Sequence, residues 1–235
     1  MARSFQLQPM HATSANAILA ALHLASPALP VGGFAYSQGL EQAIEDRWVT
    51  DMEGAYRWIH DSLVLNLARQ EVPWWLACYR AVEQGDWTGV RYANEQLHAM
   101  RETAEFRLES VQMGHSMAKL FAQWPQGQIL AELPEIVWVY PAAYAALAAV
   151  SGTTQELALS AYLWSWVENQ VLAAVKSVPL GQIEGQTLLH RLKGDIGAGM
   201  QIAETLSLAE AGTAAFGLAI TSARHETQYS RLFRS

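Results

Sequence analysis

The sequence predicts an all-α protein, a single compact domain of about ten helices packed like a helical bundle. Apolar residues recur at helical spacing along most of the 235 residues, as they do on the buried faces of amphipathic helices. No alternating strand pattern bounded by hairpin turns interrupts them. Low-complexity runs and fixed-period repeats are also missing, so we expect residues 1–235 to form one domain.

Turn and capping residues mark the expected helix ends in the first half of the chain. A helix ends at Ser26 because the following Pro27 disfavours helical backbone at the preceding residue. Thr50 and Glu53 have the spacing of a capping box, and Pro73 is expected to begin a new helix. The helices predicted in this half are residues 14–25, 34–47, 51–72, 73–84, 86–100 and 102–124.

The second half has the same signals. Gly152 ends one helix, and Thr153 with Glu156 has the spacing of a second capping box. We expect the helices of this half at residues 134–150, 157–177, 181–192, 196–209 and 213–226.

The composition indicates more apolar surface than is usual. Charged residues are 16% of the chain, against about 25% in typical globular proteins, and hydrophobic residues are 51%. This surplus must be buried in a large core or against another chain. The net charge of −7 makes nucleic acid an unfavourable partner.

Cellular location follows from three features. The single cysteine, Cys78, excludes an intramolecular disulfide and is consistent with a reducing compartment. The first residues lack the apolar core of a secretory signal, so we expect a cytoplasmic protein. Residues 136–155 carry no charge over the length of a membrane span. They contain Pro141 and Gly152 and are mostly alanine, which favours a buried helix and a turn over membrane contact.

Catalytic patterns are missing from the sequence. The seven histidines have no His-x-x-x-His spacing, so each is expected to be a surface or a satisfied core histidine. The pair Gly32-Gly33 lacks the Gly-Lys-Ser/Thr of a phosphate-binding loop. We therefore expect neither enzymatic activity nor a metal site. The alternative is an α-helical enzyme that uses the carboxylates of Glu102, Glu105 and Glu109, although no Glu-x-x-His accompanies them.

Three long segments resemble one family, the urease accessory protein UreF. They are residues 24–41 (LASPALPVGGFAYSQGLE), residues 166–182 (WVENQVLAAVKSVPLGQ) and residues 223–235 (ARHETQYSRLFRS). Residues 101–114 match more loosely. These blocks follow the family's order across the whole chain. Two positions depart from the family pattern: Gln38 stands where many members carry histidine, and Tyr140 where many carry histidine or phenylalanine.

The resemblance implies an all-helical, non-enzymatic chaperone that forms a homodimer. Such a protein binds UreD (also called UreH) and joins the GTPase UreG to the urease apoprotein (UreABC) while nickel enters the active site. It gates the fidelity of that step. The resemblance implies no tightly bound cofactor, because nickel is handled by the complex, and it implies no contact with nucleic acid or membrane.

The same resemblance assigns the candidate site residues. The face that meets the GTPase is expected to include Glu41, Glu105, Lys176, Arg101, Asn169 and Gln182. The surface for UreD and the dimer is expected to include Arg224, Tyr229, Arg231, Phe233 and Arg234. A structural turn is expected at Pro27, Pro30, Gly32 and Gly33. Residues 1–13 and 224–235 are expected to be flexible tails, and the second to become ordered when a partner binds.

Overall fold

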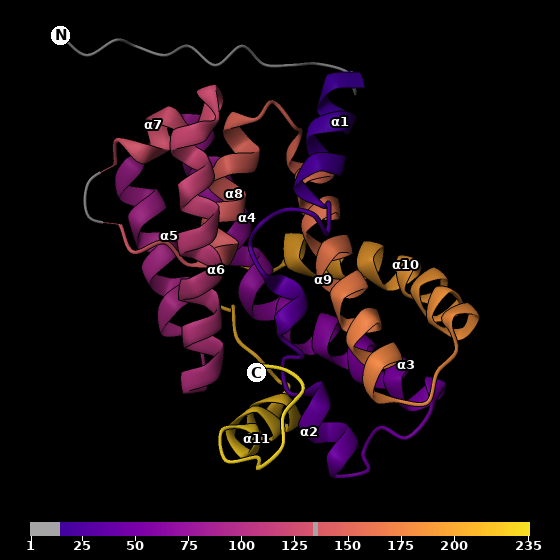
Figure 1. The fold of residues 1–235 in the computed structure, drawn as a ribbon. Helices are drawn as coiled ribbons and strands as arrows, with labels where there is room; N and C mark the ends of the chain where they lie inside the picture. Colours follow the sequence, from indigo (N-terminus) through magenta and orange to yellow (C-terminus); the bar gives the residue numbers. More distant parts are fainter. Residues whose placement is uncertain (1–14, 134–135) are drawn as a thin grey trace, which may run out of the picture.

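The computed structural model describes residues 15–133 and 136–235, and the regular elements in these ranges are all helices, with no strand (Figure 1). The prediction of an all-α protein is therefore confirmed for the described residues. The predicted N-terminal tail, residues 1–13, lies outside the described residues.

The helices follow in order from the N-terminal side. They are α1 (Ala15–Leu24), η1 (Gly33–Ala35), α2 (Leu40–Glu45), α3 (Met52–Asp61), η2 (Ser62–Glu71), α4 (Val72–Gln84), α5 (Trp87–Ala99), α6 (Ala104–Gln123), η3 (Pro125–Gly127), α7 (Gln128–Ala131), α8 (Tyr140–Val150), α9 (Gln155–Ser177), α10 (Gln182–Thr205) and α11 (Phe216–His225). The segments η1 and η3 are short 3₁₀-helices, and η2 is a π-helix.

Helix α8 is the centre of the core. Every residue from Pro141 to Ala149 is buried, and α4, α6 and α9 pack around the helix. Trp75 and Tyr79 of the adjacent helix α4 and Tyr144 of α8 itself are among the largest fully buried side chains. This is the uncharged stretch expected to be a buried helix. None of the helices in the described part of the chain is both long and apolar enough to cross a membrane.

Two predicted helix breaks are wrong. The chain runs from α3 through η2 into α4 without a turn at Pro73. Proline has no amide to donate to the Arg69 carbonyl four residues back, and this carbonyl instead accepts from the Gly212 amide at 3.1 Å. Helix α10 likewise continues through Lys193 to Asp195, where the sequence predicts a gap. Its packing against α9 and η2 outweighs the cost of about 1 kcal/mol for an internal glycine.

Neither predicted capping box forms, and each helix is instead capped by the residue after the predicted threonine. Asp51, not Thr50, caps α3 by accepting a hydrogen bond from the Gly54 amide at 2.7 Å. Thr154, not Thr153, caps α9. The Thr153 hydroxyl instead donates to the Ala148 carbonyl and ends α8. The helix expected from residue 134 begins at Tyr140, and residues 134–135 lie outside the described part. A cap was correctly predicted at Asp86 for α5.

Helix α6 lies very close to the strand-like approach to α8. A Cβ atom at Gly114 would lie 2.1 Å from the Trp138 carbonyl oxygen. We therefore expect Gly114→Ala to lower the free energy of unfolding by at least about 2 kcal/mol, measured by urea denaturation with circular dichroism. The matched control is Gly197→Ala in α10, where a Cβ would meet nothing within 4 Å. It should raise stability by about 0.5–1 kcal/mol. Equal effects of the two changes would contradict this packing.

Candidate partner-binding site

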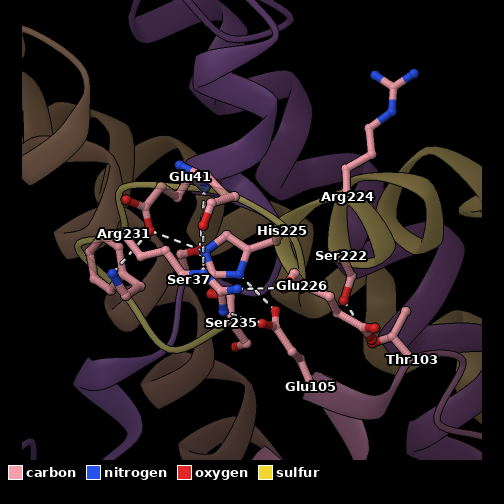
Figure 2. A network of polar contacts seen from close by, with 12 residues as sticks. Ser37, Glu41, Thr103, Glu105, Ser222, Arg224, His225, Glu226, Arg231 and Ser235 are labelled. Carbon is pink, nitrogen blue, oxygen red and sulfur yellow. Dashed lines mark hydrogen bonds and ion pairs between the residues drawn. The ribbon is translucent and has the colours of Figure 1, made fainter.

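One buried histidine joins three helices. His225, the last residue of α11, is fully buried between two carboxylates. Its Nδ1 lies 2.7 Å from Oε2 of Glu105, and its Nε2 lies 3.2 Å from Oε2 of Glu41 (Figure 2). Glu41 belongs to the first turn of α2 and Glu105 to the first turn of α6. His225 therefore holds α2, α6 and α11 at one point.

The charges in this cluster complement the helix ends. Carboxylates are favoured near helix N-termini, and Glu41 and Glu105 both lie in a first turn. Each ring nitrogen of His225 faces one of the two carboxylates.

The same two carboxylates hold the residues that follow α11, which we call the C-terminal segment (residues 226–235). Glu41 accepts hydrogen bonds from the backbone amides of Leu232 at 2.6 Å and Phe233 at 2.9 Å. Glu105 binds the Arg231 guanidinium at 2.7 Å. Glu226 caps α6 by accepting from the Ala104 amide at 2.9 Å. The segment thus wraps back over α2 and α6.

The end of the C-terminal segment contacts a turn far away in the sequence. The amides of Ser37 and Gln38 donate to the Ser235 main-chain oxygen at 2.7 and 3.1 Å. The Ser37 hydroxyl donates to the same oxygen. The next residue, Gly39, has φ of +79°, and a Cβ there would lie 2.6 Å from the Thr221 hydroxyl. Glycine is needed both for this backbone conformation and for the approach of α11.

Glu109 connects this contact to the interior. The Ser235 hydroxyl donates to its carboxyl at 2.7 Å, and the Gln38 amide nitrogen donates at 2.6 Å. Burial raises the pKa of Glu109 to about 7, although these hydrogen bonds act in the opposite direction. Gln38 also accepts from the Trp166 indole at 2.6 Å. The Gln38 side chain therefore both donates and accepts.

Residues predicted for two different contact surfaces therefore meet in one place. Glu41 and Glu105, assigned to the GTPase face, bind Arg231 and the backbone of Phe233, assigned to the UreD face. The Lys176 ammonium lies 5.7 Å from the centre of the Phe233 ring. The C-terminal segment is packed on the chain itself because Glu41 and Glu105 supply its acceptors. Its ordering on partner binding stays a prediction.

The other predicted site residues lie outside this cluster. Arg224 pairs with Asp46 at 2.8 Å and points away from His225 (Figure 2). Tyr229 is fully exposed. Gln182 is exposed at the start of α10, and Arg234 is exposed in the segment. Arg101 pairs with Glu71, and Asn169 donates to the Tyr36 carbonyl.

The predicted structural turn follows α1. Gly32 has φ of +79°, and Gly33 begins η1. Pro27 and Pro30 are exposed.

Sequence reasoning missed the groups that organise the site. His225 is a satisfied core histidine, as expected of the histidines in general, but nothing in the sequence paired it with Glu41 and Glu105. Ser37 and Glu109 were also missed. Glu105 and Glu109, considered as catalytic carboxylates, bind different partners. Among the described residues no group of three or more His, Cys, Asp or Glu is placed to hold a metal ion.

Comparison with known proteins decides the family. A sequence model of the UreF family matches residues 49–193, more than half of the chain. The chain belongs to the UreF family. The urease accessory protein UreF of Cupriavidus metallidurans is 44% identical over 234 residues, covering 95% of this chain and 100% of that protein. The UreF proteins of Azotobacter vinelandii and Azoarcus sp. (strain BH72) are 46% and 47% identical, over 94% and 91% of this chain and 100% and 94% of theirs.

Membership in the UreF family confirms the resemblance carried by the three sequence segments. The matched relatives extend well beyond residues 49–193, so the likeness of this UreF chain to known members covers nearly all of its length.

The contacts of Glu41 make it a structural residue, and this predicts the effect of its removal. Glu41→Ala leaves His225 with one carboxylate neighbour. It also removes the hydrogen-bond acceptor of the Leu232 and Phe233 amides. We expect a loss of about 2–3 kcal/mol in the free energy of unfolding. Hydrogen exchange at the Leu232 and Phe233 amides should become faster.

The control is Lys176→Ala, which removes one exposed cation beside Phe233. It should cost less than about 1 kcal/mol. Unchanged protection of the Leu232 and Phe233 amides in Glu41→Ala would contradict the assigned role of Glu41.

Proposed function

We propose that this protein is an accessory protein for urease maturation in the cytoplasm. It acts as a non-enzymatic scaffold that joins UreD (UreH) and the GTPase UreG on the urease apoprotein (UreABC) while nickel is inserted, and it gates the fidelity of that step. The observation that carries the proposal is the likeness, at 44–47% identity over nearly full length, to proteins named urease accessory protein UreF.

The C-terminal segment supports a contact with UreD. Its Arg231 and the amides of Leu232 and Phe233 are held by carboxylates, which leaves the side chains of Tyr229 and Leu232 exposed on a restrained loop. Tyrosine is a frequent interface hot spot, and a restrained loop loses less conformational entropy on binding than a free tail. We propose Tyr229 and Leu232 as the anchors for UreD.

The residues proposed for UreG lie beside this segment. Lys176 is exposed at the end of α9 next to Phe233, whereas Glu41 and Glu105 are bound inside the cluster. We propose that Lys176 makes the direct contact with UreG and that the two glutamates act by holding the segment in position. Nickel is cargo of the complex in this proposal.

Helix α1 supports a homodimer. The helix contains no acidic or basic residue other than His23, and Ile18, Leu19 and Leu22 are 43–62% exposed. An uncharged apolar helix face of this kind is typical of an interface core. We propose that two copies pair through α1, which would also bury part of the apolar surplus of the sequence.

The function is tested by urease activation in cells. We expect cells that express the urease genes without this chain to yield urease with low nickel content and low activity, and the intact chain to restore both. The Tyr229→Ala, Leu232→Ala double variant should fold normally and lose most of its co-purification with UreD. Full activation of urease in the absence of the chain would overturn the proposal.

The dimer is tested by light scattering after size-exclusion chromatography. Leu19→Arg places a charge on the exposed face of α1 and should give a monomer with unchanged helix content, because desolvating a charge opposes association. The control Leu108→Arg alters an exposed leucine of α6 and should leave the dimer intact. A dimer that survives Leu19→Arg would exclude α1 as the interface.

A further inference from the structure

A cavity of about 110 Å³ lies behind the turn that follows α1. Its lining includes most of residues 24–33, together with residues of α6, α9 and the start of α8. A cavity needs only about 10–15 Å³ to hold one water. This one is therefore large enough for a slender side chain.

Acidic groups dominate the charged lining. Glu71, Glu109 and Glu168 face the cavity, and Arg101 is the one basic residue among the described residues that line it. Arg101 is already paired with Glu71, which also accepts from the Tyr162 hydroxyl at 2.6 Å. Burial raises the pKa of both Glu109 and Glu168. The Arg101 guanidinium acts in the opposite direction on the pKa of Glu109 without offsetting burial, and among the described residues neither Glu109 nor Glu168 forms an ion pair with a basic side chain.

A second observation indicates a missing ligand. Ser110 lines the cavity and is 4% exposed, and its hydroxyl has no hydrogen-bond partner. Such a buried hydroxyl usually has one. An N–H donor that entered the cavity could donate to the Ser110 hydroxyl and to Glu109, since each carboxylate oxygen has a second lone pair to offer.

The walls fit a cation with an apolar stem. Phe106, Trp166 and Leu172 are part of the lining, and aromatic faces attract guanidinium and ammonium groups. Phe34 and Leu172 at the mouth are 61% and 42% exposed. Apolar groups at the rim favour a protein surface, which would cover them, over a free small cation.

We propose that this cavity receives the side chain of an arginine or lysine from a protein partner. The alkyl stem lies between the apolar walls, and the cationic group is bound by Glu109, Glu168 and the Ser110 hydroxyl. A metal ion does not fit as well, because no metal-binding group of His, Cys, Asp or Glu is found in the described residues. The inference rests on the proposed function in one respect only, namely that the arginine or lysine belongs to a partner protein.

The test uses the purified full-length chain and two probes of equal shape. n-Butylguanidinium mimics an arginine side chain, and N-butylurea is its neutral analogue. Ligand-observed NMR titration should give at least tenfold tighter binding of n-butylguanidinium. Glu109→Gln should weaken the binding of n-butylguanidinium at least tenfold, and Glu168→Gln should weaken it at least threefold. If Glu109→Gln does not fold, Glu168→Gln decides the test. The control Glu102→Gln alters an exposed carboxylate outside the lining and should change nothing.

The pH dependence gives an independent readout. Glu109 is faced by Tyr36, Glu71, Arg101 and Tyr140 as well as by Gln38 and Ser235. Burial places the pKa of Glu109 at about 7. Binding of n-butylguanidinium should tighten as the pH rises from 6 to 8, because Glu109 ionises, and Glu109→Gln should remove this trend.

Three results would overturn the inference. These are equal binding of the two probes, unchanged binding in both variants, and tighter binding of the free diamine putrescine than of N-acetyl-arginine methylamide. None of these results depends on urease activation, so a failure here is distinguishable from a failure of the proposed function.

Discussion

The rest of the molecule is arranged around a helix with no charge and no exposed face. The alanines of α8 let α4, α6 and α9 approach closely, and the aromatic rings of Tyr79 and Tyr144 fill the space beside them. Part of the apolar surplus in the composition is buried here, in a hydrophobic core that also draws on the other long helices. The clash expected at Gly114 shows how little freedom α6 has next to α8.

The fixed position of α6 has a direct effect on the site. Glu105 and Glu109 lie one turn apart on this helix, and each binds a different part of the C-terminal segment. The Thr103 hydroxyl, which caps α6, also lies 2.7 Å from the Ser222 hydroxyl of α11. The core therefore determines where the segment is held, and Glu109 connects the segment to the acidic cavity.

Local sequence signals made the helices predictable. Contacts between residues far apart in the sequence could not be predicted. Proline, glycine and capping residues located most helix ends to within a few residues. Two predicted breaks were wrong, because α10 continues past Gly194 where it packs against its neighbours, and a π-helix leads the chain into α4 at Pro73. Family resemblance singled out Glu41, Glu105, Arg231 and Phe233. It could not show that they meet, because no pattern in one sequence links positions more than 100 residues apart, and the cavity was invisible for the same reason.

The pairing of His225 with Glu41 has a consequence for synthesis on the ribosome. The two residues are 184 positions apart, and translation proceeds at about 5–20 residues per second. Roughly 10–40 s therefore pass between the emergence of α2 and that of its histidine. During this interval Glu41 and the Ser37 turn are made but lack their partners. A nascent chain accordingly cannot present the finished surface to other proteins, and assembly must wait until the residues after α11 are released.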